Sequence, residues 1–183
     1  MQTAPHQLSK AELESGLPAV LESPQDTGQL VAIVVRPAPN ERRVVASVSL
    51  SPDGGVAGDR WANESPIDLS GQVSLMNARF LRQIAGHDEA VALAGDNLIV
   101  DLDLSEANLP PGSQLAIGDQ TVIEVNDTPH TGCGKFQKRY GAEARAFMNN
   151  ERGMQLHLRG RYGHVVAGGT IAVGDQVRKH ASA

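Results

Sequence analysis

The most regular feature of the chain is a near-repeat built around a Gly-Asp dipeptide. Residues 112–120 have the sequence GSQLAIGDQ, and residues 169–176 have the sequence GTIAVGDQ. In both copies short apolar runs flank the Gly-Asp pair, which is a common turn signal between paired strands. Two copies are too few for a solenoid. The near-repeat therefore predicts two β-hairpins, the second of which closes the chain.

Other segments add strands to this pattern. The run at residues 28–35 is apolar and ends before a proline, and residues 42–50 are rich in β-branched side chains. Residues 97–104 alternate apolar and polar side chains except at Ile99, which is typical of a half-buried strand. A further short strand is expected at residues 72–76.

Predicted helices are few and short. Ser9 and Glu12 have the spacing of a capping box, and Gly16 followed by Pro18 predicts an early stop. Helical spacing is also found at residues 77–85 and residues 136–149.

Strands and helices do not alternate regularly along the chain, which argues against a parallel βαβ fold. The pattern favours a β-rich α+β fold, a closed barrel of short, mainly antiparallel strands with a few inserted helices. We expect an N-terminal tail and short helix over residues 1–27 and one barrel domain over residues 28–183. A chain of 183 residues is long enough for one substantial core.

Charge and composition argue against some classes of binding partner. The formal net charge is −5 and only 3% of residues are aromatic, which argues against nucleic-acid binding and base stacking. A single cysteine excludes an internal disulfide, and no apolar run has the length of a membrane span or the form of a signal peptide. We therefore expect a cytoplasmic protein that binds neither nucleic acid nor membranes.

Cys133 is placed where a reactive thiol is expected. It has glycine on both sides and lies in a loop between a predicted strand and a predicted helix. Free N–H groups at a helix start and nearby cations both favour a thiolate, and Lys135, Lys138, Arg139 and Arg145 follow closely. Basic residues bunched on an acidic protein suit a small anionic ligand. The alternative is a small buried apolar residue, as most free cysteines are.

Five further stretches occur in an order that is specific as a set. They are GDRW at 58–61, QVSLMNAR at 72–79, LAGDNL at 93–98, PHTGCGKF at 129–136 and VVAGGTIAVGD at 165–175. With these motifs the chain resembles the MOSC domain family, named for the C-terminal domain of molybdenum cofactor sulfurase. It resembles a stand-alone bacterial version of that domain.

The resemblance implies a barrel-like fold and a role in binding the molybdenum cofactor or in carrying sulfur to it. The cysteine of the family falls on Cys133. The 183 residues leave no room for the pyridoxal-phosphate-dependent desulfurase domain of the sulfurase. We therefore expect pyridoxal phosphate chemistry only through a partner cysteine desulfurase. The expected protein partner is such a desulfurase or a molybdoenzyme.

Two mechanisms would use the same thiolate. Cys133 can accept sulfur from a persulfide of the partner, which requires an accessible sulfur with a low pKa. Alternatively, it can act as a soft metal ligand to molybdenum in a pterin cofactor. His130, three residues earlier, is a candidate to polarise the thiol or move a proton, or it only satisfies a backbone group.

The anionic parts of such a cofactor need cations or polar groups. Arg60 lies in a long loop at residues 51–63 that is rich in Gly, Asp and Pro, and long loops are often functional. Asp96 and Asn97 begin a predicted strand and either bind polar groups of the pterin or form an Asx turn. The candidate cofactor-binding residues are Arg60, Asp96, Asn97, Lys135, Lys138, Arg139 and Arg159.

Other functions remain open from the sequence. His130 and Cys133, with His157 and His164, could form a zinc site, although their spacing is not that of a structural cluster. The chain has no Gly-x-Ser-x-Gly elbow of a hydrolase. The wider MOSC resemblance also implies a molybdenum-dependent reductase of N-hydroxylated compounds. A non-catalytic adaptor that docks on a desulfurase or molybdoenzyme is the remaining alternative.

Overall fold

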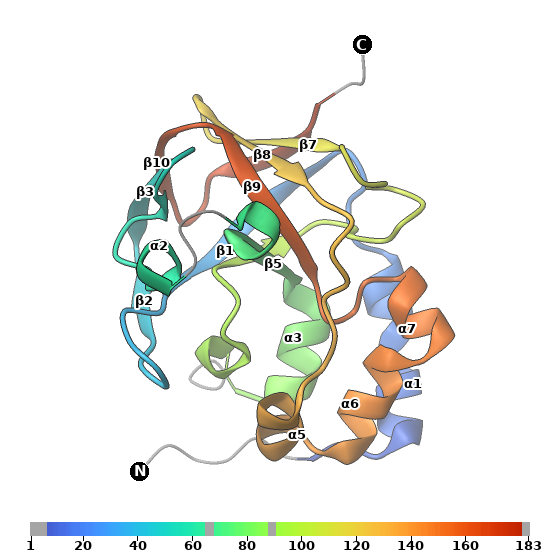
Figure 1. Cartoon of the computed structure of the whole chain (residues 1–183). Helices are drawn as coiled ribbons and strands as arrows, with labels where there is room; N and C mark the ends of the chain where they lie inside the picture. Colours follow the sequence, from blue (N-terminus) through green and yellow to red (C-terminus); the bar gives the residue numbers. More distant parts are fainter. Residues whose placement is uncertain (1–6, 65–67, 88–90, 181–183) are drawn as a thin grey trace.

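Seven strands close into a barrel in the computed structural model, which describes residues 7–64, 68–87 and 91–180 (Figure 1). In order around the barrel they are β1 (Thr27–Val35), β11 (Gln176–Lys179), β7 (Gln114–Ile117), β8 (Thr121–Val125), β9 (Arg161–Ala167), β5 (Val73–Asn77) and β6 (Leu98–Asp101). β6 pairs with β1 and completes the circle. Only the β5–β6 pair among these is parallel. The predicted β-rich, mainly antiparallel barrel is confirmed.

A second, smaller sheet lies beside the barrel. It consists of β10 (Gly169–Ala172), β3 (Ser47–Ser51) and β4 (Gly55–Val56), while β2 (Arg43–Val45) extends the main sheet from β1. The predicted segment at 42–50 is therefore two strands in different sheets.

The two copies of the near-repeat adopt different structures. The first is the predicted hairpin: β7 pairs with β8, and Gly118 in the turn has φ +61°. The second is not a hairpin, because β10 pairs with β3 whereas β11 pairs with β7 and β1. Between them, Gly174 donates its N–H to Leu30 of β1. The turn therefore passes the chain from one sheet to the other.

Helices cover one end of the barrel, where α1, α3 and α6 lie together (Figure 1). The helices are α1 (Lys10–Leu21), α2 (Trp61–Glu64), α3 (Ala78–Ala85), α5 (Gly134–Tyr140), α6 (Ala142–Asn149) and α7 (Glu151–Gln155), with 3₁₀ turns η1 (Leu69–Gly71) and η2 (Ala92–Ala94). Among the described residues, no helix has the length and apolar character needed to cross a membrane. Residues 1–6 of the expected N-terminal tail lie outside the described ranges.

Helix α1 begins with the predicted capping box between Ser9 and Glu12. The predicted stop is wrong, because the helix continues through Pro18 to Leu21. Proline removes one helical hydrogen bond, but Leu17 and Val20 are buried against the other helices. Burial of these side chains outweighs the local helix-breaking signal.

The predicted helix at 136–149 is two helices. Gly141 has φ +96°, a conformation that favours glycine, and it separates α5 from α6. The break lets α6 turn back toward the start of α5, where Cys133 lies.

Two apolar cores share strand β6. Leu98 and Val100 pack inside the barrel, whereas Ile99 packs in the core between the barrel and the helices. All three side chains are buried, so the expected half-buried strand is buried on both faces. The apolar Ile99, which broke the alternation in the sequence, is explained by this second core.

Candidate functional site

The loop that carries Cys133 is held by helix α6. The carbonyl of Gly132 accepts hydrogen bonds from Arg145 Nε at 2.9 Å and from Asn149 Nδ2 at 3.1 Å. The Gly132 N–H in turn donates to Asn149 Oδ1 at 2.8 Å. A Cβ at Gly132 would lie 2.9 Å from Met148 Sδ, so the loop packs closely on α6. These contacts fix the position of Cys133, which is exposed at the start of α5.

Its surroundings make Cys133 more acidic than an ordinary thiol. Partial burial raises the pKa of Cys133, but the backbone N–H groups of Phe136 and Lys135 and the charge of Arg159 outweigh it, so the pKa is lowered. The predicted helix-start effect is therefore present. The side chains of Lys135 and Lys138 are exposed and are not among these leading causes.

His130 is buried rather than exposed in the loop. Its ring stacks on Tyr162, with ring centroids 4.0 Å apart, and its Nδ1 lies 3.6 Å from Asp96 Oδ1. Neither of these two atoms has a hydrogen-bond partner among the described residues. Burial, followed by the charges of Arg159 and Arg36, lowers the pKa of His130 well below its usual value. The imidazole is therefore neutral at neutral pH.

Asp96 and Arg159 form a buried pair next to His130. Arg159 Nη1 donates to Asp96 Oδ2 at 2.6 Å, and Arg159 Nη2 donates to the carbonyl of Ala94 at 3.4 Å. The guanidinium also lies 5.2 Å from the centroid of the Phe136 ring. Burial raises the pKa of Asp96 despite the attraction of Arg159. Three predicted candidates, Asp96, His130 and Arg159, thus meet behind Cys133.

The side chain of Asn97 forms hydrogen bonds that connect neighbouring elements of the fold. Its Oδ1 accepts hydrogen bonds from Ser74 and Arg36, and its Nδ2 donates to Val34 and Asp59. The buried amide therefore connects β1, β5 and the loop before α2, and both N–H groups are used within the protein.

Besides Arg159, three arginines lie against the loop at residues 93–96. Arg139 donates to the carbonyl of Leu93 at 2.6 Å, Arg36 donates to the carbonyl of Gly95 at 3.2 Å, and Arg42 lies 3.2 Å from a Cβ built on Gly95. Together with Arg159 and with Arg60, whose charge acts on Arg42, they form what we call the arginine cluster.

Two arginines of this cluster pair with buried carboxylates. Asp59 pairs with Arg36 at 2.8 Å, and Asp96 pairs with Arg159 at 2.6 Å. Arg42 has no ion pair with another described residue, and its buried Nε has no hydrogen-bond partner there. Burial, followed by the charges of Arg139 and Arg60, lowers the pKa of Arg42. The cluster can therefore accept an anion.

Sequence reasoning missed Arg36, Arg42 and Tyr162. Arg36 is the residue after β1, and Arg42 precedes β2, so each lies where a strand ends or begins. Polar residues at strand ends were the only available signal. Arg60 and Arg139 were predicted and belong to the cluster, whereas Lys135 and Lys138 lie on the exposed surface of α5.

The structure does not assemble the zinc alternative. His157 Nε2 lies 2.7 Å from Glu106, and His164 lies on β9 opposite Glu124. Within the parts of the chain that the structure describes, no three His, Cys, Asp or Glu side chains are grouped for a metal ion.

The fold and site define a small β-barrel protein with an exposed, acidified thiol next to a cationic cluster. The sequence matches the MOSC domain over residues 57–178, which is more than half of the chain. The chain therefore belongs to the MOSC domain family, a family that is associated with the molybdenum cofactor. Among curated proteins, none matches the sequence.

Solved structures share the fold. YuaD from Bacillus subtilis is 17% identical, with a TM-score of 0.61 over 86% of this chain and 97% of its own. YiiM from Geobacillus stearothermophilus is 17% identical, with a TM-score of 0.57 over 84% of this chain and 75% of its own. YiiM from Escherichia coli is 18% identical, with a TM-score of 0.55 over 85% and 71% of the two chains. At this level of identity the likeness concerns the fold alone.

Proposed function

We propose that this chain binds the molybdenum cofactor, with the Cys133 thiolate as a ligand of molybdenum. The observation that carries the proposal is an exposed sulfur with a lowered pKa on one side of an arginine cluster. Thiolates are soft ligands that suit such a metal centre. A pterin cofactor that ends in phosphate also needs the cations that the cluster provides.

The cluster fits a phosphate because Arg42, unlike Arg36 and Arg159, has no carboxylate partner among the described residues. Arg42 Nε is buried without a hydrogen-bond partner among the described residues, although buried polar groups are usually paired. An anion at this point would supply the missing partner. Arg42 is therefore the residue that we assign first to the phosphate, and Arg60 and Arg139 lie near it in the cluster.

The side chains behind the Cys133 loop stabilise the thiolate and its position. Arg159, held by Asp96, stabilises the negative sulfur from inside the protein. The neutral His130, stacked on Tyr162, forms the buried wall behind the loop. When bound, the cofactor would supply a redox-active molybdenum centre, and Cys133 and the arginine cluster would hold it.

This proposal is tested by reconstitution. The full chain is incubated with isolated molybdenum cofactor and desalted, and bound molybdenum and pterin are measured per chain. We expect retention by the wild type, and weaker retention in both Cys133→Ala and Arg42→Gln. Arg178→Gln, which removes an exposed charge on β11, is the matched control and should retain the cofactor. Absence of retained molybdenum in the wild type would overturn the proposal.

A second candidate function, sulfur transfer, uses the same exposed thiolate. The Cys133 thiolate attacks the terminal sulfur of a persulfide on a cysteine desulfurase. A new S–S bond forms on Cys133, the old S–S bond breaks, and the desulfurase cysteine leaves as a thiolate. The accessibility of Cys133 favours this step, and the chain has no second cysteine to release the sulfur as a disulfide.

Mass spectrometry distinguishes the second candidate. The chain is incubated with a cysteine desulfurase, its pyridoxal phosphate and cysteine, and then separated from the enzyme. A carrier gains one sulfur atom on the peptide that contains Cys133, and Cys133→Ala gains none. A wild-type protein that stays unmodified while its thiol still reacts with iodoacetamide would rule out this role.

A further inference from the structure

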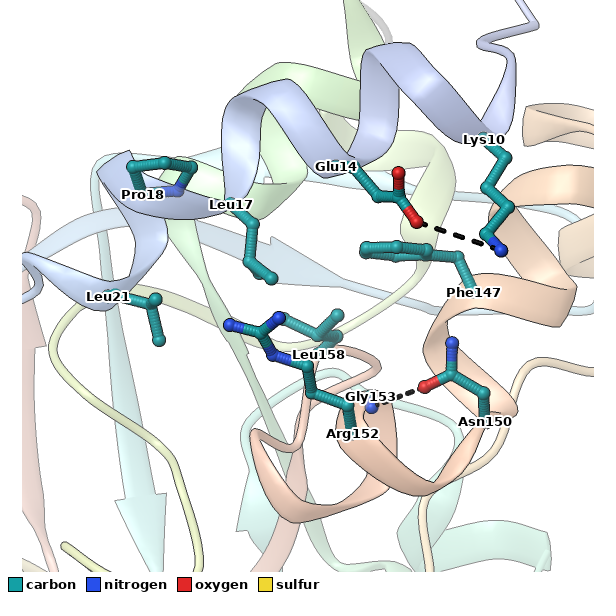
Figure 2. A pocket seen from close by; sticks show the side chains of 10 residues that line it. All are labelled: Lys10, Glu14, Leu17, Pro18, Leu21, Phe147, Asn150, Arg152, Gly153 and Leu158. Carbon is teal, nitrogen blue, oxygen red and sulfur yellow. Dashed lines mark hydrogen bonds and ion pairs between the residues drawn. The ribbon is translucent and has the colours of Figure 1, made fainter.

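A cavity of about 460 Å³ lies between helices α1, α6 and α7 (Figure 2). Its volume is in the range of small-molecule sites. None of its lining residues belongs to the Cys133 loop or to the arginine cluster. The cavity is therefore a separate site.

One part of the cavity is apolar. Leu17 on α1, Phe147 on α6 and Leu158 after α7 line it and are otherwise nearly buried. Leu21, at the end of α1, also lines it, and its side chain is 52% exposed. These side chains present apolar surface that a ligand can remove from water.

The other part is cationic. Arg152 has no ion pair with another described residue, and Figure 2 shows its side chain rising from α7 with the guanidinium toward the Leu21 end of α1. Lys10 Nζ lies 3.7 Å from Glu14 at the opposite end, where both side chains are exposed. Such an exposed pair is weak. Arg152 therefore leaves the cavity with an unpaired positive charge.

The turn between α6 and α7 holds this arrangement in place. Asn150 Oδ1 accepts the N–H of Gly153 at 2.7 Å and caps α7. A Cβ on Gly153 would lie 2.3 Å from the carbonyl oxygen of Phe147, so the two helices meet at van der Waals distance. The turn thus fixes the backbone positions of Phe147 and Arg152, while the Arg152 side chain is exposed at the edge of the cavity.

We propose that this cavity binds a small carboxylate with an apolar body. The carboxylate pairs with Arg152, whose planar guanidinium suits two-pronged recognition of that group. The apolar body lies against Leu17, Phe147 and Leu158. This binding site is independent of Cys133 and of the cofactor.

The test uses octanoate and uncharged 1-octanol as probes of the full chain. Backbone amide chemical shifts are followed by NMR while each probe is added. We expect octanoate to shift amides in α1, α6 and α7 and to bind more tightly than 1-octanol. Arg152→Gln should weaken octanoate binding about threefold to fivefold, because the lost ion pair lies at an exposed arginine. It should leave 1-octanol binding unchanged.

Three further variants complete the test. Leu21→Glu places a carboxylate on an exposed position of the lining and should also weaken octanoate binding. Arg178→Gln and Cys133→Ala should bind octanoate as the wild type does, which separates this site from the proposed function. Equal affinity for both probes, an unaffected Arg152→Gln, or no shifts in these helices at millimolar octanoate would each overturn the proposal.

Discussion

At the scale of single residues, the properties of Cys133 depend on atoms that are distant in sequence. The backbone N–H groups of α5 are local, but Arg159 is 26 positions away and is held by the buried Asp96. The reactivity of the thiol is therefore a property of the folded barrel, and it responds to changes in this pair.

We predict that the double variant Asp96→Asn/Arg159→Gln raises the pKa of Cys133 toward its ordinary value. The cation beside the thiolate is lost, while the neutral Asn/Gln pair avoids an unpaired buried charge. The rate of alkylation by iodoacetamide, measured against pH, reports this pKa. Lys138→Gln is the control on the exposed face of α5 and should leave the profile unchanged. An equal shift in both variants would contradict the assignment to Arg159.

His130 makes stability depend on pH. Its folded-state pKa is well below the unfolded value of 6.5, so the unfolded state binds the proton more readily. The free energy of unfolding should therefore fall as pH decreases from 6.5 toward the folded-state pKa. Urea denaturation at several pH values should show a shallower fall in His130→Gln than in the wild type. The exposed His180→Gln is the control and should keep the wild-type slope. Identical slopes in His130→Gln and the wild type would contradict this account.

The sequence was sufficient to predict part of this site. Cys133 and His130 are close in sequence, Asp96 lies at the start of a predicted strand, and Arg159 lies in a run of basic residues, so all four were candidates. The unpaired state of Arg42 could not be predicted, because it depends on which carboxylates the fold brings near each arginine. The stacking of Tyr162 on His130 likewise depends on how β9 lies in the barrel.

At the scale of elements, β9 must approach β5 closely to place Arg159. Gly160 has φ +108°, and a Cβ there would lie 2.0 Å from the carbonyl oxygen of Leu75. We predict that Gly160→Ala lowers the free energy of unfolding by more than about 3 kcal/mol, because the clash involves backbone. Gly174→Ala is the matched control: φ is +99°, with no atom within 4 Å of its Cβ.

Chemical denaturation measures both glycine variants. Gly174→Ala should lose only about 1–3 kcal/mol from backbone strain. Equal losses would show that strain at φ, and not the contact with Leu75, makes Gly160 necessary.

The two Gly-Asp turns show what a local sequence pattern can predict and what it cannot. The first Gly-Asp turn forms a hairpin because β7 and β8 are neighbours in the barrel. The second has the same local sequence, but β10 finds β3 as a partner and β11 closes the barrel. Turn chemistry permits a reversal of the chain, whereas strand pairing over long distances decides which sheet follows it.

At the scale of the whole molecule, the barrel closes where β1, its first strand in the sequence, pairs with β11, its last. Thr27, Gly28 and Gln29 pair with residues 176–178, and Val177 is fully buried. We predict that amide hydrogens of β11 exchange at rates set by global unfolding, as those of β8 do, although β11 lies near the C-terminus. Hydrogen exchange followed by NMR measures both strands. Exchange of β11 that is much faster than that of β8 would mean that the barrel opens locally at this seam.

The measurement that tests the central claim most directly is X-ray absorption at the molybdenum edge. Wild-type protein and Cys133→Ser are each reconstituted with the cofactor, and the sulfur atoms around molybdenum are counted. Our account predicts one more sulfur neighbour in the wild type than in Cys133→Ser, because the Cys133 thiolate binds the metal. The same number of sulfur neighbours in both proteins would show that Cys133 is not a ligand of molybdenum.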